Sequence, residues 1–184
     1  PEMGWFDVST LKEPYRIEGK KTMGLELAEQ FDWSLPDVIM YPTGGGTGVL
    51  GMWKAFSELE CLGLIGPERP RLVCVQSAAT APPVHAMGHG LEDTVAATAG
   101  HTLAYGVNVP GGVGHFRVMQ IIRESAGIAV AVAEADMKRA LAATWHWRQD
   151  WIGPEGAACL AVLPRLLDEG TIRSGEKVVV FNTG

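Results

Sequence analysis

The sequence has few cysteines and no long apolar run. Its three cysteines, Cys61, Cys74 and Cys159, lie far apart in apolar stretches and form no CxxC pair, which argues against a disulfide framework and a structural zinc site. No apolar run approaches the roughly 18 residues that a membrane-spanning helix requires. The first residues have neither signal-peptide nor transit-peptide composition. We therefore expect a protein of the reducing cytoplasm that has no membrane partner.

Clustered positive charge is also missing. The chain has 15 Lys and Arg against 21 Asp and Glu, a net charge of −6 and a pI near 5.3. The basic residues are scattered, so the sequence has no electrostatic footprint for nucleic acid or an anionic membrane. An anionic ligand must then be held by local features of the fold.

A metal site is not expected either. His85 and His89 have the spacing that places two ligands on one helical face. However, Ala86 replaces the glutamate of an HExxH motif, and Gly88 weakens the helix. We therefore predict no bound metal.

The segments that are present alternate between strand-like and helix-like patterns. Short apolar and β-branched runs predict buried strands at residues 37–41, 71–76 and 128–133, with a last strand from residue 177. Helical spacing predicts helices at residues 20–30, 49–64, 83–88, 115–125, 134–147 and 154–169. Such alternation is typical of an α/β fold with mostly parallel sheets and helices on both faces.

The most informative segment is a glycine-rich loop between the first strand and the next helix. Residues 44–48 contain four glycines. Without Cβ atoms, such a loop directs several backbone N–H groups toward one anion, and the following helix N-terminus adds more donors and a positive dipole end. A phosphate is the expected ligand. The alternative is a turn that simply needs positive φ angles.

The loop also contains a match to the dinucleotide fingerprint GxGxxG at residues 46–51. In that fingerprint the next strand ends in an acidic residue that binds a ribose hydroxyl. Here that strand ends in Gln76 and Ser77, which argues against an NAD(P)-dependent oxidoreductase. Met52 and Trp53 stand where a nucleoside triphosphate loop requires Lys and Ser or Thr.

Four motifs in one order resemble those of threonine synthases. They are PYRIEGKKT at residues 14–22, YPTGGGTG followed by GMWKAF at 41–56, PEGAA at 154–158 and FNTG at 181–184. Together they cover nearly the whole chain. The resemblance implies a pyridoxal-phosphate enzyme with a fold of the tryptophan-synthase β type, also called fold type II, of which this chain is an incomplete part.

The resemblance also implies roles for particular residues. Thr183 would meet the pyridine nitrogen, and Arg16 would bind the phosphate of O-phospho-L-homoserine, because a guanidinium suits bidentate phosphate recognition. The implied reaction is γ-elimination of phosphate and addition of water at Cβ, which yields L-threonine, in an enzyme that is a homodimer when complete. The residues implied to bind the cofactor phosphate are Gly44, Gly45, Gly46, Thr47 and Gly48.

One part of the family pattern is missing. The Schiff-base lysine of these enzymes lies N-terminal to the motifs above, and no lysine of this chain has its sequence context. We therefore expect residues 1–184 to be the C-terminal part, the large cofactor-binding lobe, and to be inactive alone. Two alternatives stay open: a serine or threonine dehydratase or β-replacement enzyme, and a non-catalytic relic that binds a phosphorylated ligand.

Overall fold

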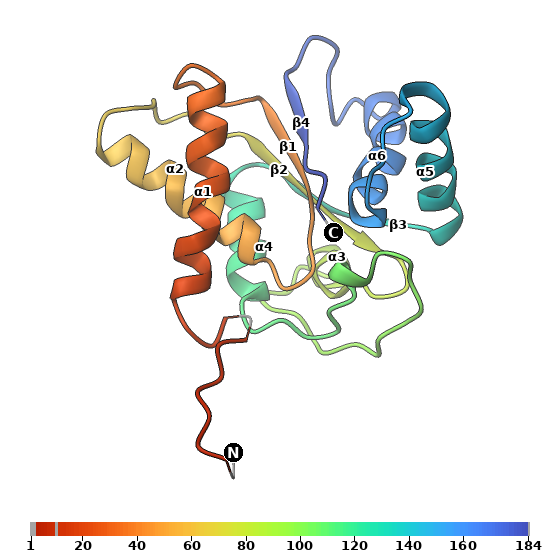
Figure 1. Cartoon of the computed structure of the whole chain (residues 1–184), viewed down its shortest axis with the longest axis horizontal. Helices are drawn as coiled ribbons and strands as arrows, with labels where there is room; N and C mark the ends of the chain where they lie inside the picture. Colours follow the sequence, from red (N-terminus) through yellow and green to blue (C-terminus); the bar gives the residue numbers. More distant parts are fainter. Residues whose placement is uncertain (1–2, 10, 184) are drawn as a thin grey trace.

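The computed structural model describes residues 3–9 and 11–183. Its centre is a four-stranded, all-parallel sheet in the order β3-β2-β1-β4 (Figure 1). The strands are β1 (Val38–Pro42), β2 (Arg71–Ser77), β3 (Ile128–Val132) and β4 (Val178–Val180). The predicted α/β class with a parallel sheet is confirmed.

Alternating side chains of the strands enter two separate cores. Ile39 and Tyr41 of β1 belong to one apolar cluster, whereas Val38 and Met40 belong to the other. This period of two is the consequence of the pleat, in which successive side chains point to opposite faces. Both faces of the sheet are therefore buried, as the continuous apolar strands predict.

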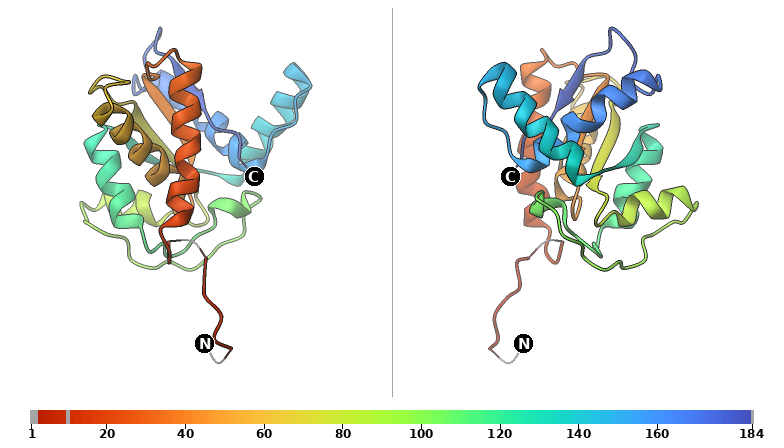
Figure 2. Two further views of the ribbon diagram at one scale, coloured as in Figure 1. Left: turned by 60° about the vertical axis from the view of Figure 1, so that its left-hand side comes forward. Right: turned by 90° about the vertical axis from the view of Figure 1, so that its right-hand side faces the viewer.

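Helices cover both faces of the sheet (Figure 1, Figure 2). The first core contains side chains of α1 (Tyr15–Gln30), α2 (Thr47–Cys61) and α4 (His115–Glu124). The second core contains side chains of α6 (Pro154–Asp168) and, through Met137, of α5 (Glu134–Arg148). Two short helices, α3 (Pro82–Gly88) and η1 (Tyr105–Val107), complete the structure. No helix of the described residues is long and apolar enough to cross a membrane.

The first helix begins earlier than the apolar spacing predicts. We expected a helix over residues 20–30, but α1 starts at Tyr15. The buried carboxylate of Glu13 accepts hydrogen bonds from the backbone N–H groups of Tyr15 at 2.5 Å and Arg16 at 3.1 Å. Carboxylates stabilise a helix start in this way. The sequence pattern missed this turn because it carries few apolar residues.

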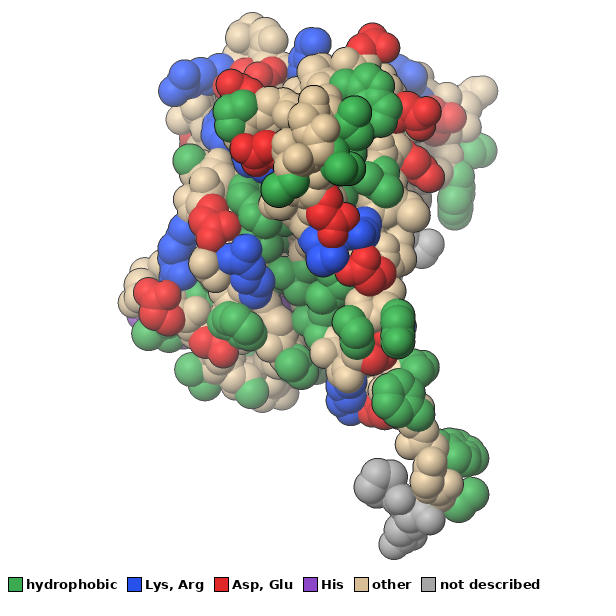
Figure 3. All heavy atoms as spheres, turned by 90° about the vertical axis from the view of Figure 1, so that its left-hand side faces the viewer, with side chains coloured by type: hydrophobic (Ala, Val, Ile, Leu, Met, Phe, Trp, Pro, Cys, Tyr) green, Lys and Arg blue, Asp and Glu red, His purple; other side chains and the backbone are tan. Residues whose placement is uncertain are grey.

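The helices α1 and α2 cross in close contact and run in the same direction. A Cβ atom on Gly51 would lie 2.6 Å from Cβ of Lys20, and one on Gly24 would lie 2.8 Å from Cβ of Ala55. Because both contact positions advance together along the chain, the N-termini of the two helices lie at the same end. The outer side of this crossing carries ion pairs that join Lys21 and Lys54 to Glu18 and Glu58. Acidic and basic side chains lie side by side on this face of the molecule (Figure 3).

Candidate anion-binding site at the switch point of the sheet

The glycine loop lies where the chain changes direction across the sheet. From β1 the chain proceeds to β2 and β3 on one side, and β4 then returns to the other side of β1. In open parallel sheets, ligands bind at the carboxyl ends of strands beside such a switch point. Met40 pairs with Val180; Thr43 and Thr183 each follow three residues later. The fold thus brings together the glycine loop and Thr183, which are distant in the sequence.

Close packing explains why the loop consists of glycines. Gly46 has a φ of +86° and precedes the first residue of α2. A Cβ atom there would lie 2.2 Å from Cγ2 of Val118, one on Gly44 would lie 2.5 Å from the carbonyl oxygen of Gly106, and one on Gly48 would lie 2.1 Å from Oη of Tyr41. Only Gly46 needs a positive φ, so a simple turn does not account for the run of glycines.

Two buried side chains fix the carbonyl groups of the loop. Nε2 of Gln76 donates to the carbonyl oxygen of Thr43 at 3.1 Å, and Nε2 of His115 lies 2.9 Å from that of Gly44. Oε1 of Gln76 also accepts the N–H of Val84 at 3.3 Å. Gln76 is therefore committed to holding the loop and is inaccessible to a ribose, which argues against the dinucleotide alternative.

The N–H groups of the loop remain available to a ligand. Within residues 3–9 and 11–183, no acceptor bonds the backbone N–H groups of residues 44–49; the first bond of α2 runs from Leu50 N to Gly46 O at 3.0 Å. Unpaired donors at a helix N-terminus, together with the helix dipole, form an anion site. The donor set fits a phosphate group.

Segments from the far side of the sheet pack against this loop. Oε1 of Glu155, in the first turn of α6, accepts the N–H of Gly106 at 2.8 Å, and the carbonyl of Gly106 faces Gly44. Oδ1 of Asn182 accepts the N–H of Gly153 at 3.0 Å. The start of α6 is thereby tied both to the segment over the glycine loop and to the residue before Thr183.

The structure places the two other predicted site residues at the rim. Thr183 is partly buried three residues after the end of β4, and Arg16 is exposed in the first turn of α1. Arg16 precedes Lys20 by one helical turn, as Thr47 precedes Gly51, and Lys20 contacts Gly51. Arg16 therefore lies one turn nearer the N-terminus than Lys20, at the end of the crossing where α2 also starts. The hydrogen bond of Arg16 to Glu13 uses its backbone N–H, and the described residues provide no partner for its guanidinium.

His115 is a residue that the sequence analysis missed. Its side chain is fully buried, and Nδ1 accepts the N–H of Gly112 at 3.2 Å and lies 3.1 Å from Oγ1 of Thr94. Because Nδ1 is an acceptor, the proton resides on Nε2, which donates to Gly44. Burial lowers the pKa of His115 and so favours this neutral form. The only sequence signal is its place after the glycine-rich residues 111–114.

Three lysines that form ion pairs, and the two histidines with the spacing of metal ligands, lie apart from the glycine loop. Lys12 pairs with Asp7 at 2.5 Å, and Lys21 and Lys54 form the charged cluster outside α1 and α2. The described residues contain no group of three or more His, Cys, Asp or Glu that could hold a metal ion. His85 and His89 stack on each other with ring centroids 4.2 Å apart.

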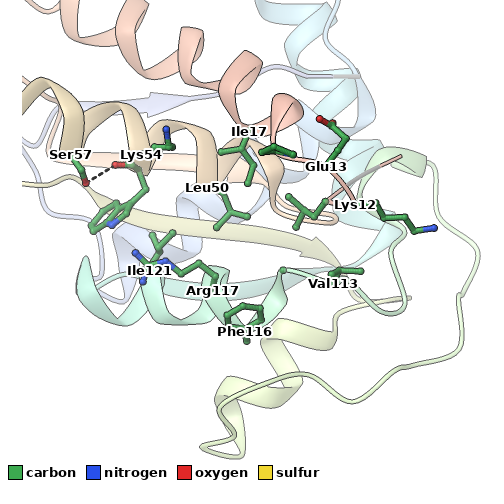
Figure 4. A pocket seen from close by; sticks show the side chains of 14 residues that line it. Lys12, Glu13, Ile17, Leu50, Lys54, Ser57, Val113, Phe116, Arg117 and Ile121 are labelled. Atoms are coloured by element: carbon green, nitrogen blue, oxygen red, sulfur yellow. Dashed lines mark hydrogen bonds between the residues drawn. The ribbon is translucent and has the colours of Figure 1, made fainter. Parts of the chain in front are cut away.

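A separate apolar pocket of about 720 Å³ opens between α1, α2 and α4 (Figure 4). Its wall includes Ile17, Leu50, Val113, Phe116 and Ile121. It contains neither the glycine loop nor Thr183. The pocket therefore differs in place and chemistry from the anion site.

The fold and site define an open, parallel α/β domain with a phosphate-type glycine loop at its switch point. A family model described as pyridoxal-phosphate dependent enzyme matches residues 2–184. The chain therefore belongs to the pyridoxal-phosphate dependent enzymes, and the expected cofactor class is confirmed.

Known proteins resemble the chain in sequence and in fold. It is 29% identical over 171 residues to threonine synthase of Methanocaldococcus jannaschii and 32% identical over 171 residues to that of Methanosarcina acetivorans. Each match covers 93% of this chain and 42% of the relative. The solved structure of threonine deaminase isoform 2 from Solanum lycopersicum matches with a TM-score of 0.71 at 21% identity, over 94% of this chain and 46% of that one. The expected fold type is thus confirmed, and the chain spans less than half the length of these proteins.

Proposed function

We propose that this chain is the large cofactor-binding lobe of a threonine synthase, which converts O-phospho-L-homoserine and water to L-threonine and phosphate. The observation that carries the proposal is the similarity to threonine synthases over 93% of the chain. The free N–H groups at the switch point and the arginine beside them support it, because the reaction requires two phosphate groups to be bound near one another.

In this proposal the glycine loop holds the cofactor phosphate and Thr183 faces the pyridine nitrogen. The N–H groups of residues 44–48 and the dipole of α2 neutralise the phosphate without a charged side chain. The Thr183 hydroxyl, unlike a carboxylate, does not hold a proton on the ring nitrogen. Bound pyridoxal phosphate supplies the electron sink that stabilises negative charge on the substrate carbons.

Arg16 is proposed to bind the phosphate of the substrate. Its side chain is exposed at the end of the helix crossing where α2 starts, and its guanidinium has no partner among the described residues, so it is free to form a bidentate pair with a phosphate. Cα and Cβ of the substrate lose a proton each, and the Cγ–O bond breaks with release of phosphate. Cγ then gains a proton and becomes the methyl group, and water adds its hydroxyl at Cβ while Cα regains a proton. Because phosphate is the leaving group, a fixed cation beside it also stabilises the charge that develops.

The remaining parts of the enzyme are proposed to lie outside this chain. The chain covers 42% of the length of its threonine synthase relatives, and no lysine within it has the sequence context of the Schiff-base residue. We propose that this lysine belongs to a further segment, that the chain alone is inactive and that the complete enzyme is a homodimer.

The test uses the complete protein that the gene encodes, supplied with pyridoxal phosphate. O-Phospho-L-homoserine should yield phosphate and threonine in equal amounts. Arg16→Gln should raise KM for this substrate about tenfold or more, since a hydrogen bond to a charged group contributes roughly 1.5–3 kcal/mol. Arg139→Gln, which removes another exposed arginine from α5, should leave KM unchanged.

Other outcomes would select the alternatives. Release of ammonia from serine or threonine, without phosphate release from O-phospho-L-homoserine, would identify a dehydratase and contradict the synthase. Binding of the phosphorylated substrate without turnover in the complete, cofactor-loaded protein would identify a non-catalytic relic.

A further inference from the structure

We propose that His115 is a positioning residue that aims the backbone N–H of Gly45 at the cofactor phosphate by holding the carbonyl of Gly44. This inference rests on the proposed role of the glycine loop. His115 is buried and touches no reacting atom. The proposal nevertheless gives it a part in phosphate recognition, which its place in the sequence does not indicate.

The geometry of the peptide bond links the two groups. In a planar trans peptide, the carbonyl of one residue and the N–H of the next point in opposite directions. Nε2 of His115 lies 2.9 Å from the carbonyl oxygen of Gly44, on the buried side of the loop. The N–H of Gly45 therefore points away from the buried imidazole, where no described acceptor meets it.

Gln76 fixes the orientation of the preceding peptide bond, between Thr43 and Gly44, in the same way. Its Nε2 donates to the carbonyl oxygen of Thr43 at 3.1 Å, so the N–H of Gly44 also points away from the buried side chain. Glycine peptides have two easily reached orientations, since no Cβ restricts them. Two buried donors therefore fix two consecutive peptides in the orientation that presents adjacent N–H groups to one anion.

The surroundings of His115 fix its own orientation. Nδ1 accepts the N–H of Gly112 at 3.2 Å and lies 3.1 Å from Oγ1 of Thr94. A Cβ atom on Gly112 would lie 2.3 Å from Nε2 of His115, so the backbone packs closely against the ring. The imidazole is consequently held as the tautomer that donates from Nε2, and the segment before α4 supports the loop through it.

The experiment compares the affinities of the complete protein for pyridoxal phosphate and for pyridoxal, which lacks the phosphate. His115→Asn keeps a polar side chain but is too short to reach Gly44, whereas His115→Gln carries an N–H donor at the reach of Nε2. We expect the ratio of the two affinities to fall about tenfold in His115→Asn, the equivalent of roughly 1.4 kcal/mol. It should stay within about threefold of wild type in His115→Gln.

A matched control separates positioning from loss of stability. Ser125→Ala removes another buried polar group at the far end of α4, where Oγ of Ser125 accepts the N–H of Leu72 at 3.3 Å. This variant should lose stability without changing the affinity ratio. The ³¹P resonance of the bound cofactor should shift in His115→Asn and stay at the wild-type position in Ser125→Ala.

Two results would overturn the proposal in different ways. An unchanged affinity ratio and ³¹P resonance in His115→Asn, with wild type favouring pyridoxal phosphate, would show that His115 does not position the loop. Equal affinity of the wild-type protein for both compounds would instead contradict the phosphate site itself, and with it the proposed function.

Discussion

At the scale of single residues, Gly46 has the most restrictive position in the loop. It combines a φ of +86° with a Cβ position only 2.2 Å from Cγ2 of Val118. We expect Gly46→Ala to lower the free energy of unfolding by about 2–5 kcal/mol, from left-handed strain of roughly 1–2 kcal/mol and overpacking of roughly 1–3 kcal/mol. Urea denaturation measures this change.

Gly63 provides the matched control for this substitution. Its φ is +71°, but a Cβ atom there would have nothing within 4 Å. Gly63→Ala should therefore show only the left-handed strain, about 1–2 kcal/mol. Equal destabilisation by the two substitutions would mean that Val118 moves aside without penalty and that the loop is less tightly packed than the structure indicates.

The sequence predicts the glycine loop but not the side chains that support it. The glycines of the loop are recognisable because four of them stand between an apolar run and a helical pattern. Gln76 and His115 support the same loop from 33 and 71 residues away in the chain. Nothing local marks either side chain as a partner, because the pairing exists only after the sheet has formed.

At the scale of elements, the crossing of α1 and α2 positions the site. Gly51 lets the backbone of α1 approach, since a Cβ atom there would lie 2.7 Å from the carbonyl carbon of Lys20. Gly51→Ala should push α1 away and lower the free energy of unfolding by about 1–3 kcal/mol, despite a gain in helix propensity of at most about 1 kcal/mol. If Arg16 binds the phosphate of O-phospho-L-homoserine as proposed, Gly51→Ala should also weaken binding of this substrate, because Arg16 moves with α1.

Gly19 tests whether that loss comes from the crossing or from helix propensity. It lies on the exposed side of α1, and a Cβ atom there would have nothing within 4 Å. Gly19→Ala should stabilise the protein by roughly 0.5–1 kcal/mol. If both substitutions stabilised the protein, the close approach of the two helices would be disproved.

The elements themselves were largely readable from the sequence. The strands of residues 38–42, 71–77 and 128–132 follow the apolar runs that predicted them, within one residue at each end. The helix that begins at Tyr15 was missed by five residues because its first turn is polar and depends on Glu13, a cap before the helix. Side-chain caps of this kind do not change the spacing of apolar residues, so that spacing does not reveal them.

At the scale of the whole molecule, the parallel sheet and its two helical layers follow from the alternation of strands and helices. The strand order does not, because which side of β1 receives the last strand depends on packing between distant segments. That order creates the switch point and brings Thr183 to the glycine loop. The family motifs implied this proximity, whereas the periodicities alone did not.

The reactivity of the three cysteines shows whether the cores on both faces of the sheet are folded. Cys74 lies in the core that α1, α2 and α4 cover. Cys159 is a residue of α6 and lies in the core on the other face of the sheet. Cys61 is exposed. Burial raises the pKa of Cys74 to about 12 and also raises the pKa of Cys159. Since the thiolate is the reactive form, a thiol reagent at neutral pH should label one cysteine of the native protein, and none in Cys61→Ser.

Denaturant should then expose the two remaining thiols together. The two cores share one sheet, so we expect Cys74 and Cys159 to become reactive at the same urea concentration and at the midpoint seen by circular dichroism. Mass spectrometry of the labelled peptides distinguishes the two sites. Labelling of Cys159 well before Cys74 would show instead that the layer of α5 and α6 opens as a separate unit, with the glycine loop and its supporting residues still folded beneath the opposite layer.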